Sequence, residues 1–196
     1  MRVIAGTARV TVLKALEGLE TRPTADRVKE AMFSIIQFEI PGKKVLDLFG
    51  GSGQLGIEAM SRGADSAVFV DASNQACAIV KENLKRTHFE NKARVVCSDY
   101  LNFLKSCKDK FGVILLDPPY AEDFLEKSLK IITEIDILQS GGIIVTERPY
   151  GKELCCGFDG YVRSKDYKYG KTVVTIFRKA DEQKEYHEDR YLSGYF

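Results

Sequence analysis

Residues 45–56 read Val45-Leu46-Asp47-Leu48-Phe49-Gly50-Gly51-Ser52-Gly53-Gln54-Leu55-Gly56. An apolar run containing one acid leads into a cluster of glycines, and a helical pattern follows. This order is typical of a buried strand, a tight turn and a helix, because glycine permits the turn and lets a ligand approach the backbone. The helix N-terminus also favours anionic groups. The stretch therefore predicts a ligand-binding turn inside a domain built from strands and helices.

Strands and helices alternate beyond this turn. Apolar runs predict strands at 44–49, 67–71, 94–98, 112–117 and 142–147. Helical patterns lie between them, at 54–62, 74–88, 100–108 and 122–135. Continuous apolar strands separated by helices indicate a parallel sheet that is covered on both faces. The sequence therefore predicts an α/β fold with a doubly wound, mostly parallel sheet.

The two ends of the chain depart from this alternation. β-branched residues within 2–14 predict a short hairpin arm. Thr24 is a candidate N-cap for a helix with one apolar face, which we expect to end at Pro41-Gly42. The segments 161–166 and 172–178 predict a second hairpin, closing one edge of the sheet.

Three regions follow from this pattern: an N-terminal arm with a helix, a ligand-binding core and a polar C-terminal tail. They are expected at 1–43, 44–179 and 180–196.

Composition excludes several classes of protein. The 196 residues are 44% apolar, which suits one domain with an ample core. No apolar run has the length of a membrane span, and no segment resembles a signal peptide. Five cysteines without a C-x-x-C pair, and only two histidines, argue against a zinc site and a Ser-His-Asp triad. We therefore expect a monomeric cytoplasmic protein whose chemistry needs neither metal nor histidine.

Acidic residues lie at the ends of four predicted strands. They are Asp47, Asp71, Asp99 and Asp117. Doubly wound sheets bind ligands at the carboxyl ends of their strands. Asp71 can accept both hydroxyls of a ribose, and Asp99 can accept the amino group of an adenine. An acid at Asp47 suits a ligand with a positive amino group, such as S-adenosylmethionine.

The glycines are also compatible with a nicotinamide cofactor. Gly51, Gly53 and Gly56 match the G-x-G-x-x-G pattern of dinucleotide sites. Asp71 fits the ribose of either cofactor. Asp47 lies where the phosphates of a dinucleotide would approach, so it favours S-adenosylmethionine over NAD.

The fourth acid opens a stiff turn, Asp117-Pro118-Pro119-Tyr120. Two consecutive prolines cannot continue a strand ladder, so the chain must leave the sheet in an extended turn. Asp117 and the carbonyl of Pro118 then become fixed acceptors beside the Tyr120 ring. Two acceptors and an aromatic face suit a flat base that carries an amino group and has left its stack.

Together these motifs resemble a known family. The glycine-rich turn, Asp71, Asp99 and the Asp-Pro-Pro-Tyr turn look like a class I S-adenosylmethionine-dependent amino-methyltransferase. The segments 2–6 and 21–33 narrow the resemblance, over about residues 1–179, to the RsmD-type bacterial 16S ribosomal RNA guanine-N2 methyltransferases. The resemblance implies a seven-stranded sheet with an N-terminal hairpin extension, S-adenosylmethionine as cofactor, and 16S rRNA or the small ribosomal subunit as partner.

Charge distribution supports a polyanionic partner. The net charge is +1, yet the segment from Tyr161 to Lys179 contains six basic residues and one acid. The arm and the first helix are also basic. The candidate RNA-binding residues are Arg2, Arg9, Arg22, Arg27, Lys165, Lys168 and Lys171. The candidate catalytic residues are Asp117, Pro118, Pro119 and Tyr120. The candidate cofactor-binding residues are Thr24, Asp47, Phe49, Gly50, Gly51, Ser52, Gly53, Asp71, Ala72, Ser98, Asp99 and Tyr100.

Three other functions stay open. An amino-methyltransferase acting on DNA adenine or on a protein glutamine could use the same turn, but the Arg-Pro-Thr segment at 22–24 favours RNA. A nicotinamide oxidoreductase is disfavoured by Asp47 and by the turn at Asp117. A non-catalytic ribosome-assembly protein is disfavoured because Asp117 and the glycines are intact.

The arm departs from the family's pattern at one place. The family usually has a glycine and another basic residue shortly after the arm's arginine, whereas Arg9 is followed here by Val10-Thr11-Val12. The resemblance implies that the arm contacts RNA, so this departure concerns RNA affinity or target identity.

Overall fold

The computed structural model describes residues 1–16, 23–119, 123–155 and 157–180. Its strands are β1 (Lys44–Asp47), β2 (Ser66–Asp71), β3 (Ala93–Cys97), β4 (Phe111–Leu116), β5 (Leu138–Pro149), β6 (Gly157–Phe158), β7 (Tyr161–Tyr169) and β8 (Thr172–Lys179). Its helices are α1 (Pro23–Ile35), α2 (Gln54–Ser61), α3 (Asn74–Thr87), α4 (Tyr100–Ser106) and α5 (Phe124–Glu134), with a 3-10 turn at Glu90–Lys92. None of the helices in the described ranges is long and apolar enough to cross a membrane.

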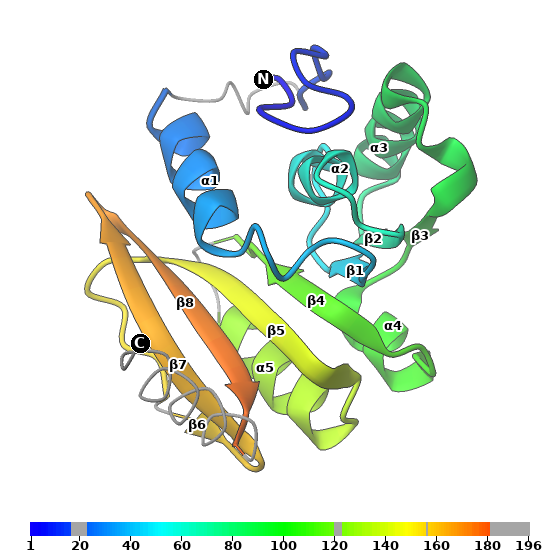
Figure 1. Cartoon of the computed structure of the whole chain (residues 1–196). Coiled ribbons are helices and arrows are strands. Elements are labelled where there is room, and N and C mark those ends of the chain that lie inside the picture. The colour runs from blue at the N-terminus through cyan, green and yellow to red at the C-terminus, as the bar shows by residue number, and fades with distance from the viewer. Residues whose placement is uncertain (17–22, 120–122, 156, 181–196) are drawn as a thin grey trace, which may run out of the picture.

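The strands form one sheet in the order β3-β2-β1-β4-β5-β8-β7-β6 (Figure 1). The pairs from β3 to β5 are parallel, and β8, β7 and β6 run antiparallel to their neighbours. This arrangement confirms the predicted doubly wound, mostly parallel fold. The two-residue strand β6 adds an eighth strand to the seven that the resemblance implied.

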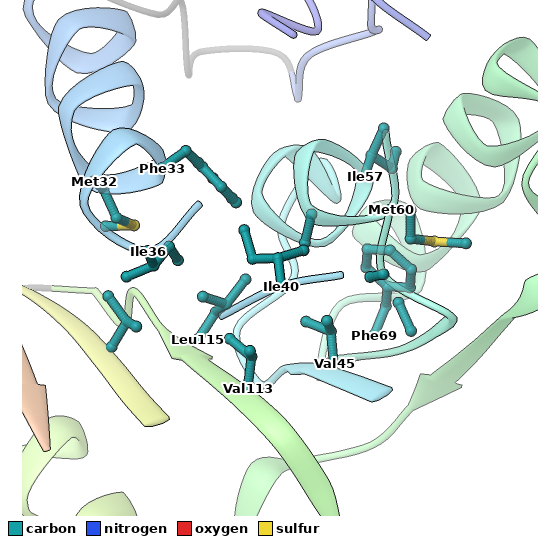
Figure 2. Close-up of a cluster of buried hydrophobic side chains, with 14 of the residues drawn as sticks. Met32, Phe33, Ile36, Ile40, Val45, Ile57, Met60, Phe69, Val113 and Leu115 are labelled. Carbon is teal, nitrogen blue, oxygen red and sulfur yellow. The ribbon is translucent and has the colours of Figure 1, made fainter. Parts of the chain in front are cut away.

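Helices cover both faces of the sheet, as Figure 1 shows, with α1, α2 and α3 on one side and α4 and α5 on the other. Alternate strand residues supply the two cores, because successive side chains in a strand point to opposite faces. Val45 and Val113 pack with residues of α1 and α2 (Figure 2), whereas Leu46 and Ile114 pack with residues of α4 and α5. The strands are therefore buried on both sides, which explains their continuous apolar sequence.

The helix α1 differs from its prediction at both ends. It begins at Pro23, so Thr24 lies in the first turn and does not occupy the cap position. Proline suits the first helical position, because its missing N–H has no partner there. The helix ends at Ile35, well before Pro41. Ile36 and Ile40 nevertheless remain fully buried, because the chain turns along the core after the helix ends.

The N-terminal arm is a looser hairpin than predicted. An isolated antiparallel bridge joins Arg2 to Val12, and Val3 N donates to Thr11 O at 3.0 Å. Val3 and Leu13 are buried in the same core as α1 and α2. The arm is therefore packed onto the sheet's helical layer. Of the predicted tail at 180–196, residues 181–196 lie outside the described ranges.

Candidate active site

The glycine-rich turn joins β1 to α2 at the carboxyl edge of the sheet. Gly50 N donates to Val70 O at 2.8 Å, which ties the turn to β2. Gly51 (φ 53°) and Gly53 (φ 78°) both adopt left-handed backbone conformations, which glycine adopts without a steric penalty. A Cβ built on Gly51 meets no atom within 4 Å, so the backbone at this point faces open space. The turn can therefore receive a ligand.

Close packing of α2 on β2 fixes the turn's position. A Cβ at Gly56 would lie 2.3 Å from Cε1 of Phe69, so a larger residue would push the helix away from the sheet. Asp47 supports the turn from below: it is 1% exposed, and its Oδ2 accepts a 2.9 Å hydrogen bond from Gly56 N. Burial raises the pKa of Asp47 to about 7, the Gly56 bond opposes this, and the Asp71 charge adds to it. The predicted contact of Asp47 with the cofactor's amino group stays a prediction.

Asp71 links the end of β2 to the glycine turn. Its Oδ2 accepts from Gly51 N and its Oδ1 accepts from Ser73 N, both at 2.8 Å. The next strand ends beside it, because Ser98 N donates to the Asp71 carbonyl at 2.9 Å. Asp99 is exposed and caps α4 by accepting from Leu101 N at 2.8 Å. The structure thus brings the predicted ribose and adenine acceptors to one edge.

An aromatic cluster lies beside these acids. The Phe49 ring lies 5.3 Å from the Tyr100 ring and 6.2 Å from the Phe124 ring, measured between centroids. Tyr100 is buried, and Phe49 is half-buried two residues after the end of β1. Among the remaining cofactor candidates, Ala72 is exposed beside Asp71, and the side chain of Thr24 lies outside what the structure describes.

Asp117 follows β4 directly and lies close to the glycine turn. Asp47 of β1 pairs in register with Leu115 of β4, two residues before Asp117. Asp117 as a whole residue is exposed, yet the surrounding protein removes water from its carboxyl. This desolvation, followed by the charges of Glu147 and Asp47, raises the pKa of Asp117 to about 8.

The rest of the turn is partly described. Pro118 is buried and Pro119 is exposed, and both line a hollow of about 10 Å³ with residues at the end of β5. Tyr120 lies outside the described ranges.

Known proteins resemble this chain in sequence and in structure. A family model described as "Conserved hypothetical protein 95" matches residues 1–178. "Ribosomal RNA small subunit methyltransferase D" of Haemophilus influenzae is 34% identical over 157 residues, covering 79% of this chain and 81% of that protein. The chain belongs to the RsmD family.

Two further relatives support membership of the RsmD family. "Putative rRNA methyltransferase YlbH" of Bacillus subtilis is 41% identical over 182 residues, covering 91% of this chain and 99% of that protein. A solved structure described as "Putative methyltransferase yhhF from Escherichia coli" superposes with a TM-score of 0.82 at 28% identity, covering 91% of this chain and 97% of that one. The resemblance drawn from the sequence is therefore confirmed, while the roles of individual residues stay predictions.

The sequence reasoning missed Glu147 of this RsmD-family protein. Glu147 lies at the carboxyl end of the strand predicted at 142–147, and its charge is one cause of the raised pKa of Asp117. The signal was present, because an acid at a strand end is the same feature that identified the other four.

Arg148 was also missed, and it supports the wall beside the Asp117 turn. This buried side chain donates to Asp166 Oδ2 at 2.8 Å and to the Lys152 carbonyl at 2.6 Å. It thereby ties β5 to β7 and to the loop after β5. Together with Pro118 and Pro119 it lines the small hollow beside the turn.

The predicted RNA-binding residues divide between two regions of the RsmD fold. Arg2, Arg9 and Arg27 are exposed on the arm and α1, and Arg22 lies outside the described ranges. Lys165, Lys168 and Lys171 are exposed on the hairpin of β7 and β8.

The tip of that hairpin reaches the carboxyl edge of the sheet, since Tyr150 N, just after β5, donates to Lys171 O at 2.7 Å. Lys168 Nζ lies 3.4 Å from the centroid of the exposed Tyr150 ring. Among the residues that the structure describes, no cluster of three or more histidine, cysteine or acidic side chains could hold a metal ion.

Proposed function

We propose that this protein transfers a methyl group from S-adenosylmethionine to the exocyclic N2 of a guanine in 16S ribosomal RNA. The observation that carries the proposal is the position of Asp117, which follows β4 beside the glycine turn of β1. Membership of the RsmD family supports it, because relatives carry the name ribosomal RNA small subunit methyltransferase D.

The residues of the carboxyl edge fit S-adenosylmethionine. The open backbone at Gly51 leaves room for the ligand, and the Asp71 carboxylate beside it suits the ribose hydroxyls. Asp99 would accept the adenine amino group, with Ser98 and Tyr100 beside it. S-adenosylmethionine supplies an electrophilic methyl group attached to a positively charged sulfur.

Asp117 has the principal chemical task in this proposal. The guanine amine is a poor nucleophile, because its lone pair is delocalised into the ring. Asp117 and the Pro118 carbonyl accept hydrogen bonds from its two N–H groups and turn the lone pair toward the methyl group. The new nitrogen–carbon bond forms as the carbon–sulfur bond breaks, so positioning supplies most of the rate, up to roughly 7–11 kcal/mol in favourable cases.

The product amine then loses one proton. An acid whose pKa is raised above its usual range accepts a proton near neutral pH more readily than an ordinary aspartate does. Asp117 can therefore receive the proton directly or through water. Tyr120 is proposed to stack on the base.

Nucleoside mass spectrometry of small-subunit RNA tests the proposal. RNA from cells that lack the protein should lose one N2-methylguanosine. The wild-type gene should restore it, whereas the Asp117→Ala variant, which lacks the acceptor, should not. An unchanged RNA profile together with lost methyladenine in DNA would instead support the DNA-directed alternative. Restoration by Asp117→Ala would show that the turn is only structural.

A further inference from the structure

One buried amide joins the arm to the glycine turn. Asn83 of α3 is 0% exposed. Its Nδ2 donates to Lys14 O and to Ser52 O, both at 2.9 Å, and its Oδ1 accepts from Lys14 N at 2.8 Å. Lys14 lies at the end of the arm, and Ser52 lies between the two left-handed glycines of the turn. Both donors and the acceptor of this side chain are therefore engaged.

A second contact joins the same two segments. Ser52 Oγ donates to Met1 Sδ at 3.2 Å, so the side chain and the carbonyl of Ser52 both face the arm's attachment. Gly51, the residue before Ser52 in the turn, is held by Asp71 on the proposed ribose side. The turn thus lies between the proposed cofactor site and the base of the arm.

The arm's other attachments do not touch the turn. The buried carboxylate of Glu58 on α2 accepts from Ile4 N at 2.8 Å and Ala5 N at 3.1 Å, and Ser61 Oγ accepts from Ala8 N at 2.9 Å. These bonds seat the middle of the arm on α2. The Asn83 amide, by contrast, bonds both the arm and the turn.

A buried amide cannot exchange a lost partner for water without a large penalty. A shift of the Ser52 carbonyl must therefore move the Asn83 amide, and that movement is transmitted to both backbone groups of Lys14. The reverse holds when the arm moves.

We propose that Asn83 is a positioning residue that couples the cofactor turn to the RNA-binding arm. Cofactor binding orders the arm, and RNA on the arm tightens cofactor binding by the same factor, because coupling between two sites is reciprocal. This inference rests on the proposed function, which supplies the two ligands.

Hydrogen exchange of the arm tests the coupling without any RNA. The probe is S-adenosylhomocysteine, the demethylated cofactor, at a saturating concentration. In the wild type it should slow exchange of the hydrogen-bonded arm amides Val3, Val10 and Leu13 by about fivefold or more. In Asn83→Ala the same ligand should leave their exchange unchanged.

Glu82→Gln is the matched control. Glu82 lies next to Asn83 on α3 and forms a 2.8 Å ion pair with the Lys14 side chain, so it holds the arm without touching Ser52. This variant should keep the ligand-dependent slowing. If S-adenosylhomocysteine binds the wild type and the arm amides do not respond, the coupling is wrong, even if Asn83→Ala fails to fold. If the ligand does not bind at all, the proposed function fails first.

A second measurement separates coupling from a structural role. S-adenosylhomocysteine affinity is measured with and without deproteinised 16S rRNA. The ratio of the two affinities should be about fivefold or more in the wild type and in Glu82→Gln, and close to one in Asn83→Ala. A residue that only supports the fold would weaken both affinities and leave their ratio intact, and that result would overturn the proposal.

Discussion

Val10 has a backbone conformation that its side chain disfavours. Its φ is 68°, in the left-handed region, and its side chain is 67% exposed at the tip of the arm. A β-branched residue in this region is a steric outlier, at a cost of roughly 1–2 kcal/mol. The family resemblance predicts a glycine shortly after the arm's arginine, and glycine adopts this conformation without a steric penalty. Strain of this kind often marks a functional segment.

We expect Val10→Gly to raise the free energy of unfolding by up to about 1 kcal/mol. Relief of the left-handed strain exceeds the extra entropy that glycine gives the unfolded chain, roughly 0.5–1 kcal/mol. Val12→Gly is the control, because Val12 is equally exposed without a positive φ and pairs with Arg2. That variant should be destabilised. Urea unfolding measures the free energy of unfolding of both variants. Equal destabilisation would show that Val10 is not strained.

Asp47 is a buried acid whose charge opposes folding. Its pKa is raised to about 7 in the folded protein, above the unfolded value of about 4, so the folded state binds the extra proton between these values. The stabilisation that comes from protonated Asp47 is therefore fully present at low pH and is lost as the pH rises from about 4 to 7.

We expect Asp47→Asn to gain stability relative to the wild type as the pH rises. The asparagine Oδ1 can still accept from Gly56 N, but no charge is buried. The difference in free energy of unfolding between variant and wild type should grow between pH 4 and 7, by at most on the order of 4 kcal/mol. Denaturant unfolding at several pH values measures it, and a difference independent of pH would contradict the raised pKa.

At the scale of elements, the sequence predicted the strands and helices of the parallel sheet to within a few residues. Those strands are buried on both faces, so their apolar runs are unambiguous. The errors lie where tertiary contacts decide. The strand β5 begins at Leu138, before the predicted start, because Leu138 pairs with Phe111 across an irregularity in the ladder. No local sequence pattern predicts that pairing.

The hairpin of β7 and β8 extends further than predicted and brings its tip to the carboxyl edge. Lys168 and Lys171 therefore lie near the end of β5, on the same side of the sheet as the proposed site. The exposed Tyr150 ring under Lys168 adds an aromatic surface. Cations beside an exposed ring suit a nucleic-acid strand, through phosphate contact and base stacking.

We expect Lys168→Glu to weaken RNA binding and to reduce the slope of log affinity against log salt by about one, because one phosphate contact is lost. Lys105→Glu is the control, since Lys105 is exposed in the last turn of α4, away from the carboxyl edge. Filter binding of 16S rRNA at several salt concentrations measures both. Equal effects of the two reversals would mean that only total charge matters.

At the scale of the whole molecule, the sheet assembles a site from segments far apart in sequence. The acids at strand ends were predictable, because the carboxyl edge of a doubly wound sheet is known from topology alone. Asn83 was not predicted, although it occupies the buried face of α3 beside Leu84. A polar residue on an apolar helical face signals a buried hydrogen bond, but its partners in the arm and the turn required the structure.

This assembly also determines which ligand stabilises the fold. A ligand that binds only the folded state at about 100 times its Kd adds about 2.7 kcal/mol, which for a domain of this size raises Tm by about 5–10 °C. We expect S-adenosylmethionine and S-adenosylhomocysteine to produce such a shift and NAD to produce none, because the buried acid Asp47 underlies the turn where a dinucleotide would place its phosphates. Asp71→Ala should reduce the shift, since Asp71 holds Gly51 N and faces the proposed ribose position. Scanning calorimetry with each ligand measures these shifts, and stabilisation by NAD alone would exclude the methyltransferase function.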